Sequence, residues 1–282
     1  MAKILAGKEV TEALNQDLIK RSEVLTGKGV IPCLAIVRVG ERPDDLAYER
    51  SATLRAEKTG ILVKKFIFPN EILQDELAAE IVKINNDAAI HGVLIFRPMP
   101  AHIDDELIRN TLDPSKDIDG ITDVSQAGVY SGSSKGYPPC TAEACMEIIR
   151  YYGVELRGKN VAVIGRSQVI GKPVAMMLIR ENATVTVCHT KTVNIADICK
   201  DKDVVIAAAG SIGMVTKDFL RAGQTVIDVA VNFDENGKMK GDVVFEDAES
   251  IVDAITPVPG GVGGVTTSIL MKHCIEAAEK RN

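Results

Sequence analysis

The feature that most constrains the fold is an alternation of short apolar segments with amphipathic ones along nearly the whole chain. Apolar runs typical of buried strands lie at 31–39, 61–68, 92–96, 160–164, 184–188, 204–208 and 225–229. Segments with helical periodicity lie at 7–26, 44–58, 73–86, 142–152, from 169 onward and in the last stretch up to residue 280. Strands that alternate with helices are typical of repeated βαβ units, whose strands run parallel. The sequence therefore predicts an α/β protein.

The length and composition favour two domains. A chain of 282 residues with 46% hydrophobic residues can bury more than one medium-sized core. From 113 to 141 the composition shifts to Gly, Ser, Pro and Tyr with little periodicity, so we expect the domain junction there. The second half, with its succession of strands and helices, is typical of a dinucleotide-binding domain.

Charge and cysteine content exclude several classes of protein. A net charge of −6 argues against a nucleic-acid surface, which needs clustered Lys and Arg. The six cysteines show no C-x-x-C spacing and lie mostly in apolar stretches, as expected for buried, reduced thiols. The four histidines have no metal-ligand spacing, and no apolar run approaches a membrane span or a signal peptide. We therefore expect a cytoplasmic protein with no metal, nucleic-acid or membrane partner.

Residues 161–173, Val-Ala-Val-Ile-Gly-Arg-Ser-Gln-Val-Ile-Gly-Lys-Pro, suggest a strand, a glycine-bounded turn and a helix. Backbone N–H groups of such a turn, with the helix N-terminus behind them, suit an anion. Gly165 and Gly171 are separated by five residues, which fits neither G-x-G-x-x-G nor G-x-x-x-x-G-K-[ST]. A nucleotide phosphate site and an ordinary βα turn are the two interpretations.

The end of the second strand of this half bears on the choice of cofactor. NAD-binding folds normally place Asp or Glu there, about 20 residues beyond the glycines, to bind the ribose hydroxyl. Here the strand runs into His-Thr-Lys-Thr at 189–192, which offers hydroxyls and a cation instead. Arg166 inside the glycine turn could reach the same position and bind a phosphate. The pattern favours NADP over NAD.

The first half carries two irregular loops and one tyrosine of interest. The prolines in Arg-Pro-Met-Pro-Ala-His, 97–102, end regular structure just after a strand, where α/β sheets bind ligands. Asp117 and Asp119 would face the same way in an extended segment, or they form a turn. Tyr48 on a predicted helix is either structural or catalytic. Residues 132–136 match G-x-S-x-G but lack the preceding strand and following helix of a hydrolase nucleophile turn.

Taken together, six ordered motifs give the chain a specific resemblance to a known family over nearly its full length. They are Val39-Gly with Tyr48, Pro-Met-Pro-Ala-His at 98–102, Lys-Asp-Ile-Asp-Gly at 116–120, Pro-Cys-Thr at 139–141, the turn at 163–173 and Thr-Pro-Val-Pro-Gly-Gly-Val-Gly at 256–263. With this spacing the chain resembles the bacterial methylenetetrahydrofolate dehydrogenase/methenyltetrahydrofolate cyclohydrolases.

The resemblance implies a domain arrangement. It implies a folate-binding catalytic domain at 1–140 and a Rossmann-like NAD(P)-binding domain at 141–267. The last helix, 268–282, would return to the first domain. Folate would bind between the domains, and the usual assembly is a homodimer.

The resemblance also implies site residues. Tyr48 and Asp119 would be catalytic, with Asp119 anchoring the folate. Further folate contacts would come from Pro98, Pro100, Pro259, Gly260 and Gly261. Cofactor contacts would come from Gly165, Arg166, Ser167, Gly171, His189, Thr190, Lys191, Thr192, Gly263 and Thr266.

Two departures from the family pattern bear on mechanism. The family usually has lysine four residues after the tyrosine and a glutamine that partners it, and this chain has Ala52 and Phe96 there. Hydride transfer needs orientation above all, whereas hydrolysis of the methenyl product needs general acid–base catalysis. We therefore expect NADP-dependent oxidation of 5,10-methylenetetrahydrofolate to 5,10-methenyltetrahydrofolate, with weak or absent cyclohydrolase activity.

Three alternatives stay open at this point. Arg50, Arg97 or a hydroxyl near Tyr48 could substitute for the missing pair and leave the enzyme bifunctional. The chain could instead be a folate or nucleotide binder without chemistry. A two-domain dehydrogenase for a hydroxy or amino acid is the third, and the loops of the first half do not favour it.

Overall fold

The computed structural model describes residues 1–281 and divides the chain into two compact units. The C-terminal unit comprises Met1–Glu12 and Thr141–Thr266, and the N-terminal unit comprises Ala13–Cys140 and the residues from Thr267 onward. The sequence had placed residues 1–12 with the folate-binding domain. In the structure they belong to the C-terminal unit, because the strand β1 (Lys3–Ile4) pairs in parallel with β11 (Ala254–Ile255).

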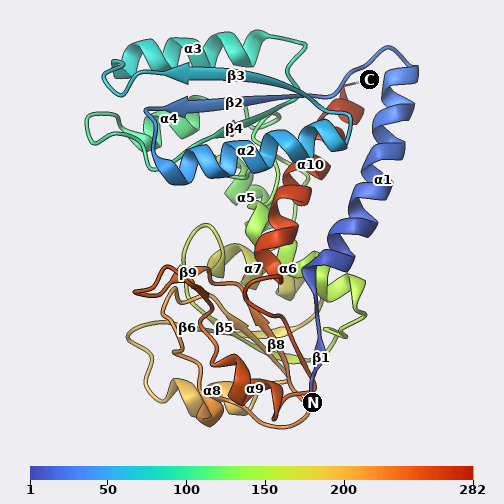
Figure 1. Cartoon of the computed structure of the whole chain (residues 1–282), viewed down its shortest axis with the longest axis vertical. Helices are drawn as coiled ribbons and strands as arrows, with labels where there is room; N and C mark the ends of the chain where they lie inside the picture. Colours follow the sequence, from blue (N-terminus) through green and yellow to red (C-terminus); the bar gives the residue numbers. More distant parts are fainter. Residues whose placement is uncertain (282) are drawn as a thin grey trace. The chain divides into compact units, whose positions relative to one another are not determined.

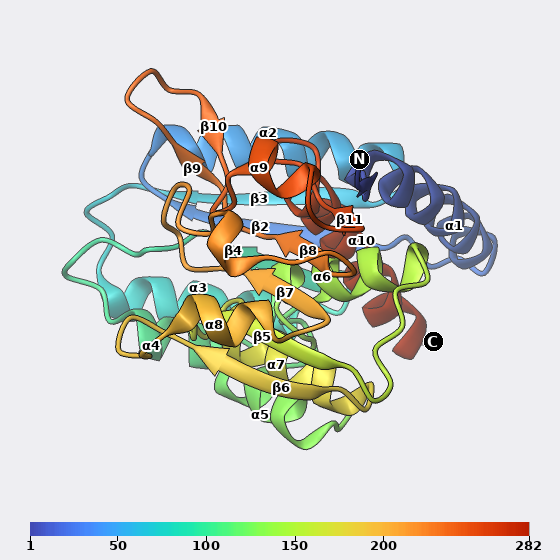
Figure 2. The ribbon, with the colours of Figure 1, turned by 90° about the horizontal axis from the view of Figure 1, so that it is seen from below.

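The N-terminal unit is built on a three-stranded parallel sheet with the order β3-β2-β4. Its strands are β2 (Cys33–Val39), β3 (Leu62–Phe68) and β4 (Gly92–Ile95). The helix α2 (Pro43–Lys58) covers one face, and α3 (Gln74–Asn86) and α4 (Asp105–Thr111) cover the other (Figures 1 and 2). Every residue of the central strand β2 is buried, as the unbroken apolar run of a two-sided parallel sheet requires.

The core of this unit lies between the sheet and α3. Leu77, Ile81 and Ile84 recur at helical spacing on α3 and are at most 1% exposed. They pack with Val37 and the other buried side chains on that face of β2 and β4. The resulting layer fixes the carboxyl ends of β2 and β4, where the candidate site begins.

The last helix, α10 (Val262–Lys280), joins the N-terminal unit from Thr267 onward. There it pairs with α1 (Gly7–Gly27): the Arg21 guanidinium donates to both carboxylate oxygens of Glu279, at 2.9 and 2.7 Å. The Ser268 hydroxyl donates to the side chain of Asn15 at 3.2 Å. The final helix is thereby held in the N-terminal unit.

The C-terminal unit has a six-stranded parallel sheet with the order β1-β11-β8-β7-β5-β6. Its further strands are β5 (Asn160–Ile164), β6 (Thr184–Cys188), β7 (Val204–Ala207) and β8 (Thr225–Asp228). The helices are α6 (Cys140–Tyr151) and α7 (Gly171–Arg180) on one face, with α8 (Ile195–Lys200) and α9 (Phe245–Glu249) on the other (Figure 1). The strand order reverses between β5 and β7, and open α/β sheets bind ligands at the carboxyl end of such a switch point.

The α/β class is confirmed, and the chain passes from one compact unit to the other at Cys140 and Thr141, the end of the stretch 113–141. That stretch lies almost entirely inside the N-terminal unit and contains the helix α5 (Asp123–Ser131). The Thr122 hydroxyl caps α5, and Gly132, with φ +69°, ends it. Its Gly, Ser and Pro residues therefore form caps and turns, and the G-x-S-x-G match begins at a helix end with no strand before it.

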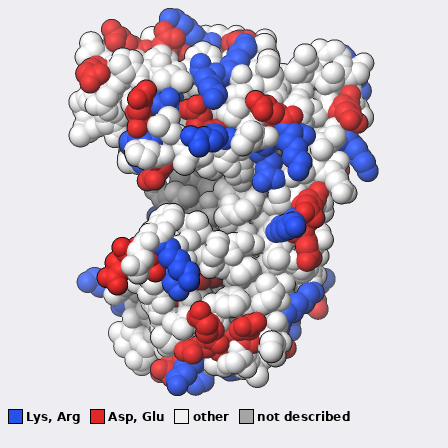
Figure 3. Space-filling model, viewed as in Figure 1, with Lys and Arg blue, Asp and Glu red and all other residues white. Residues whose placement is uncertain are grey.

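The surface shows no feature of a nucleic-acid-binding protein on the face seen in Figure 3. Lys and Arg side chains are interspersed there with Asp and Glu, without a continuous cationic area. Within residues 1–281, no helix combines the length and apolar composition needed to cross a bilayer. All six cysteines are buried.

Candidate active site

The loop that carries the two aspartates is attached to the edge of the N-terminal sheet. Asp117 forms a parallel bridge with Val93 of β4, and the N–H of Val93 donates to the carbonyl of Lys116 at 2.8 Å. The buried Lys116 ammonium donates to the carbonyls of Ile84 and Asp87 at the end of α3, at 2.8 and 2.7 Å. The loop is thus fixed from two sides.

The two aspartates have different environments. Asp117 is fully buried, and its carboxylate accepts hydrogen bonds from the N–H groups of Ile121 and Thr122 and from the Ser125 hydroxyl, at 3.0, 2.8 and 2.6 Å. Asp119 keeps part of its surface exposed. Burial, with the like charge of Asp117 as a second cause, raises the pKa of Asp119 to about 7. Asp117 is therefore a structural anchor, whereas Asp119 keeps an accessible surface.

Tyr48 of α2 lies close enough to Asp119 for the two groups to interact electrostatically. Its ring meets that of Phe96 edge to face, with centroids 5.7 Å apart. Burial, reinforced by the charge of Asp119, raises the pKa of the Tyr48 phenol well above its ordinary value, although a hydrogen bond with Thr267 opposes this. The phenol therefore stays protonated at neutral pH and can donate or accept a hydrogen bond. The structure thus brings together Tyr48 and Asp119.

The two departures from the family pattern both fall on buried apolar positions. Ala52 is one turn beyond Tyr48 on the same face of α2 and is 0% exposed. Phe96 directly follows β4, is 7% exposed and packs on Tyr48. Neither side chain can accept or donate a proton.

The arginines considered as substitutes are poorly suited to proton transfer. The Arg97 guanidinium makes a two-pronged ion pair with Asp105, with Nε 2.6 Å from Oδ1 and Nη2 on Oδ2. That hydrogen bonding raises the pKa of Arg97 above its ordinary value, so the group stays charged. Arg50 is exposed on α2. The loop beyond Arg97 carries Pro98, which is exposed, and Pro100, which is half-buried.

The C-terminal unit offers a second site at the β5/β7 switch point. Gly165 directly follows β5 with φ +123°, and a Cβ there would lie 2.2 Å from the carbonyl oxygen of Ala208 after β7. A Cβ on Gly171, at the start of α7, would lie 2.2 Å from the carbonyl oxygen of Gly165. Both glycines are therefore required by close backbone packing. The Ser167 hydroxyl accepts the N–H of Ile170 at 3.1 Å and so closes the intervening turn.

The turn after β6 is ordered by its own side chains. The N–H of His189 donates to the Thr192 hydroxyl at 2.9 Å, and the N–H of Lys191 donates to Nδ1 of His189 at 3.1 Å. Thr190, Lys191 and Arg166 are exposed. The turn between Gly165 and Gly171 has no room for side chains at its two ends. The exposed Thr190 hydroxyl and the cations of Lys191 and Arg166 lie at the same edge of the sheet. Together these features fit a phosphorylated dinucleotide.

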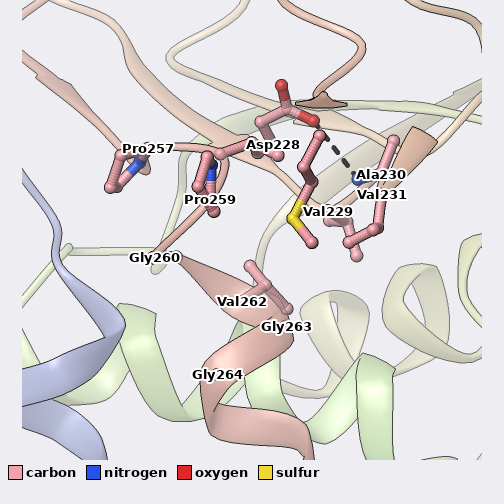
Figure 4. Close-up of a pocket in the computed structure, with 13 residues that line it drawn as sticks. Asp228, Val229, Ala230, Val231, Pro257, Pro259, Gly260, Val262, Gly263 and Gly264 are labelled. Atoms are coloured by element: carbon pink, nitrogen blue, oxygen red, sulfur yellow. Dashed lines mark hydrogen bonds between the residues drawn. The ribbon is translucent and has the colours of Figure 1, made fainter. Parts of the chain in front are cut away.

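A cavity of about 310 Å³ in this unit is formed by the segment between β11 and α10 together with residues that follow β8 (Figure 4). Its lining includes Pro259, Gly260, Gly261 and Gly263, which the sequence predicted as contacts. Gly260 has φ +102°. Thr266 lies on the first turn of α10, where its hydroxyl donates to the carbonyl of Val262 at 3.3 Å.

The sequence did not point to Asp228 or Met239, which line this cavity, or to Gly7, which supports its loop. Asp228, at the carboxyl end of β8, accepts the N–H of Ala230 at 3.2 Å and, like Met239, contributes to the lining (Figure 4). Gly7 supports the loop: its N–H donates to the carbonyl of Gly260 at 2.8 Å, and a Cβ on it would lie 2.1 Å from the carbonyl oxygen of Gly261. The position of Asp228 at the end of a predicted strand could have marked it as a site residue. The contact of Gly7 with the backbone of Gly260 and Gly261 leaves no signal in the sequence. Among the described residues, no group of three His, Cys, Asp or Glu could hold a metal ion.

The two units define a class: a two-domain α/β protein with a dinucleotide-type site at a sheet switch point and a separate carboxylate–phenol site. Family models agree. Residues 5–119 match the catalytic domain of tetrahydrofolate dehydrogenase/cyclohydrolase, and residues 139–282 match its NAD(P)-binding domain. The chain belongs to the tetrahydrofolate dehydrogenase/cyclohydrolase family, whose members are enzymes.

Individual relatives extend over the whole chain. The bifunctional protein FolD of Carboxydothermus hydrogenoformans is 46% identical over 284 residues, covering 100% of this chain and 99% of its own. The crystal structure of FolD from Campylobacter jejuni is 35% identical, covers 100% of both chains and has a TM-score of 0.97. FolD from Trypanosoma brucei, solved with NADP and an inhibitor, is 35% identical over 99% of this chain and 98% of its own, with a TM-score of 0.92.

Proposed function

We propose that this chain oxidises 5,10-methylenetetrahydrofolate to 5,10-methenyltetrahydrofolate with NADP and hydrolyses the methenyl product weakly or not at all. Family membership supports the dehydrogenase half. The second half rests on one observation: the positions of the family's lysine and glutamine are occupied by the buried, apolar Ala52 and Phe96 beside Tyr48.

The residues of the N-terminal unit have binding and orienting roles in this proposal. Asp119 holds the pterin ring by accepting its N–H groups, and the protonated Tyr48 fixes the other side of the folate. Phe96 packs against the Tyr48 ring and restricts its rotation. When bound, NADP supplies the hydride acceptor. Orientation of the methylene carbon is what this step requires, and none of these roles needs a general base.

Hydrolysis of the methenyl group requires a water to be activated and protons to be moved, which a placed acid–base group accelerates by about 10²–10⁴-fold. The groups near Tyr48 do not supply one. The pKa of Tyr48 is raised well above 10, Arg97 is paired with Asp105, and Asp119 is committed to the folate. We therefore expect a methenyl product that leaves without enzymatic hydrolysis.

The cofactor preference is part of the same proposal. Arg166, with Thr190 and Lys191, would bind the 2′-phosphate of NADP, and their exposure supports that role. The other predicted cofactor contacts, Gly165, Ser167, Gly171, His189, Thr192, Gly263 and Thr266, would shape the backbone around the dinucleotide. A homodimer in the cytoplasm is also proposed, on the family resemblance.

The experiment measures both reactions on the purified protein. NADP reduction with methylenetetrahydrofolate should be robust, and a non-catalytic binder would give none. Methenyltetrahydrofolate hydrolysis should stay within about twofold of the uncatalysed rate, against the 10²-fold or more of placed acid–base catalysis. Hydrolysis that is strongly accelerated and lost in Asp119→Asn would refute the loss of cyclohydrolase activity.

A reconstruction gives the converse test. The double variant Ala52→Lys with Phe96→Gln should gain cyclohydrolase activity, whereas Ala52→Met with Phe96→Leu, a matched apolar pair, should gain none. If the reconstructed pair gains nothing while dehydrogenase activity persists, the missing pair has been assigned to the wrong positions.

A further inference from the structure

A second cavity, of about 540 Å³, lies in the N-terminal unit and has a cationic lining. Lys135 enters it from the segment after α5, and Lys280 and Arg281 enter it from the end of α10. Among the described lining residues the only carboxylate is that of Asp113, whose Oδ1 already accepts the N–H of Ser115 at 2.8 Å. In a chain with a net charge of −6, a cavity with this excess of positive charge suits an anion.

This cavity lies at the other end of β4 from the loops that resemble a folate site. Nη1 of Arg281 donates to the carbonyl of Ile90 at 2.9 Å, just before β4 begins. The proline loop at 97–102 follows the carboxyl end of the same strand. The four residues of β4, at about 3.3 Å each, separate the two ends by about 13 Å. The cavity is therefore separate from the candidate folate site.

A buried tyrosine supplies a fixed hydrogen-bond donor in the lining. Tyr137 is only 4% exposed, and its ring packs on the His273 ring with centroids 5.0 Å apart. The Lys280 ammonium lies 4.3 Å from the Tyr137 centroid and donates to its hydroxyl at 3.2 Å. Burial raises the pKa of the Tyr137 phenol above its ordinary value, so the hydroxyl stays protonated. Because it accepts from Lys280, its own hydrogen is left to donate to a ligand.

The kind of donor favours phosphate over carboxylate. The guanidinium of Arg281 is held by a backbone carbonyl at Nη1 and by the Ser115 hydroxyl at Nη2, each at 2.9 Å. Its flat fork is therefore not free for a two-pronged contact with a carboxylate. The other donors are the ammonium groups of Lys135 and Lys280 and the Tyr137 hydroxyl. Such single-point donors suit the oxygens of a phosphate, which point in several directions.

We propose that this cavity is a binding site for a small phosphorylated molecule, whose phosphate is held by Lys135, Lys280 and the Tyr137 hydroxyl. Arg281 contributes its charge while it stays attached to the backbone before β4. The volume lies within the range of about 300–1,000 Å³ that is typical of small-molecule sites, so the ligand has room for a body beyond its phosphate. The site is additional to the proposed function and does not depend on it.

The test titrates inorganic pyrophosphate into the full-length protein with NADP in excess, so that the turn after β5 is already occupied. Calorimetry should give a Kd of about 1 mM or below, and the amide of Gly136, in the lining, should shift in ¹H–¹⁵N spectra. Lys135→Gln with Lys280→Gln should weaken binding at least about tenfold, because charge-assisted contacts are lost. Lys20→Gln with Lys58→Gln removes the same charge from exposed positions on α1 and α2 and should leave the Kd unchanged.

Two milder variants keep the test decisive if the double change at the cavity impairs folding. Lys135→Gln changes only an exposed side chain, and Tyr137→Phe removes only a hydroxyl. Each should weaken pyrophosphate binding by about three- to tenfold. If both bind pyrophosphate as the parent does, the proposal is wrong.

Citrate at matched ionic strength distinguishes phosphate from carboxylate. It should bind more weakly than pyrophosphate, and citrate binding that is equally tight would overturn the assignment to phosphate. Absence of saturable pyrophosphate binding would overturn the site itself. So would an equal loss of affinity in the cavity variant and in the Lys20 and Lys58 control, since that result would indicate an adventitious ion only.

Discussion

Replacing Glu49 by glutamine should destabilise the N-terminal unit by about 3 kcal/mol. Glu49 follows Tyr48 on α2, and its carboxylate lies 2.8 Å from Nε of Arg38 on β2, with side chains only 9% and 5% exposed. Breaking a buried ion pair by neutralising one partner costs about 3–5 kcal/mol, because the other charge is left buried. Arg38 keeps its hydrogen bond to the carbonyl of Gly40, which places the expected loss at the lower end.

A second ion pair of the Glu49 carboxylate, with Lys65, provides a control. Lys65 contacts Glu49 at 2.9 Å, but its side chain is 40% exposed. Exposed pairs contribute about 0–1 kcal/mol, so Lys65→Met should cost less than about 1 kcal/mol. Replacing both buried partners, Arg38→Met with Glu49→Leu, should be much less destabilising than Glu49→Gln alone, because no unpaired charge remains.

Urea unfolding at several pH values measures these differences. Burial opposes the ionisation of Glu49, but hydrogen bonds from Lys65 and Arg38 outweigh it, so the pKa of Glu49 lies below its ordinary value of 4.5. The stabilisation is therefore complete above that ordinary value and is lost as the pH falls through the lowered pKa of the folded state. A cost below about 1 kcal/mol at pH 7 for Glu49→Gln, or a cost equal to that of Lys65→Met, would refute the reasoning.

Two further predictions concern the C-terminal unit. Gly165→Ala should weaken NADP binding at least about tenfold by calorimetry, because its Cβ would meet the Ala208 carbonyl at 2.2 Å. Gly158→Ala, at φ +74° with nothing within 4 Å, should cost about 1 kcal/mol of stability and leave binding unchanged. Arg166→Ala should raise KM for NADP about tenfold and leave KM for NAD alone, since a charge-assisted bond contributes about 1.5–3 kcal/mol. Arg180→Ala, an exposed arginine on α7, should change neither, and an unchanged KM for NADP in Arg166→Ala would remove the basis for the cofactor preference.

The sequence predicted the long elements because their periodicity is set locally. The apolar run of β2 and the helical spacing of Leu77, Ile81 and Ile84 can be read without tertiary information. The two-residue strands β1 and β11 carry no such signal, since their pairing joins segments about 250 residues apart. For this reason the placement of residues 1–12 with the C-terminal unit could not be predicted from composition.

The candidate site, like the fold, could be predicted from the sequence only in part. Asp119 and Tyr48 could be singled out because they stand in motifs, and the structure brings them together. The different environments of Asp117 and Asp119 depend on N–H groups of Ile121 and Thr122, which adjacent sequence does not indicate.

The central claim is that this enzyme catalyses the oxidation without the hydrolysis. The most direct measurement follows NADP reduction and the methenyl absorbance together during turnover of methylenetetrahydrofolate by the unmodified protein. We expect methenyltetrahydrofolate to accumulate in step with NADPH and then to decay at the uncatalysed rate, whatever the enzyme concentration. A methenyl decay that accelerates in proportion to enzyme would contradict it.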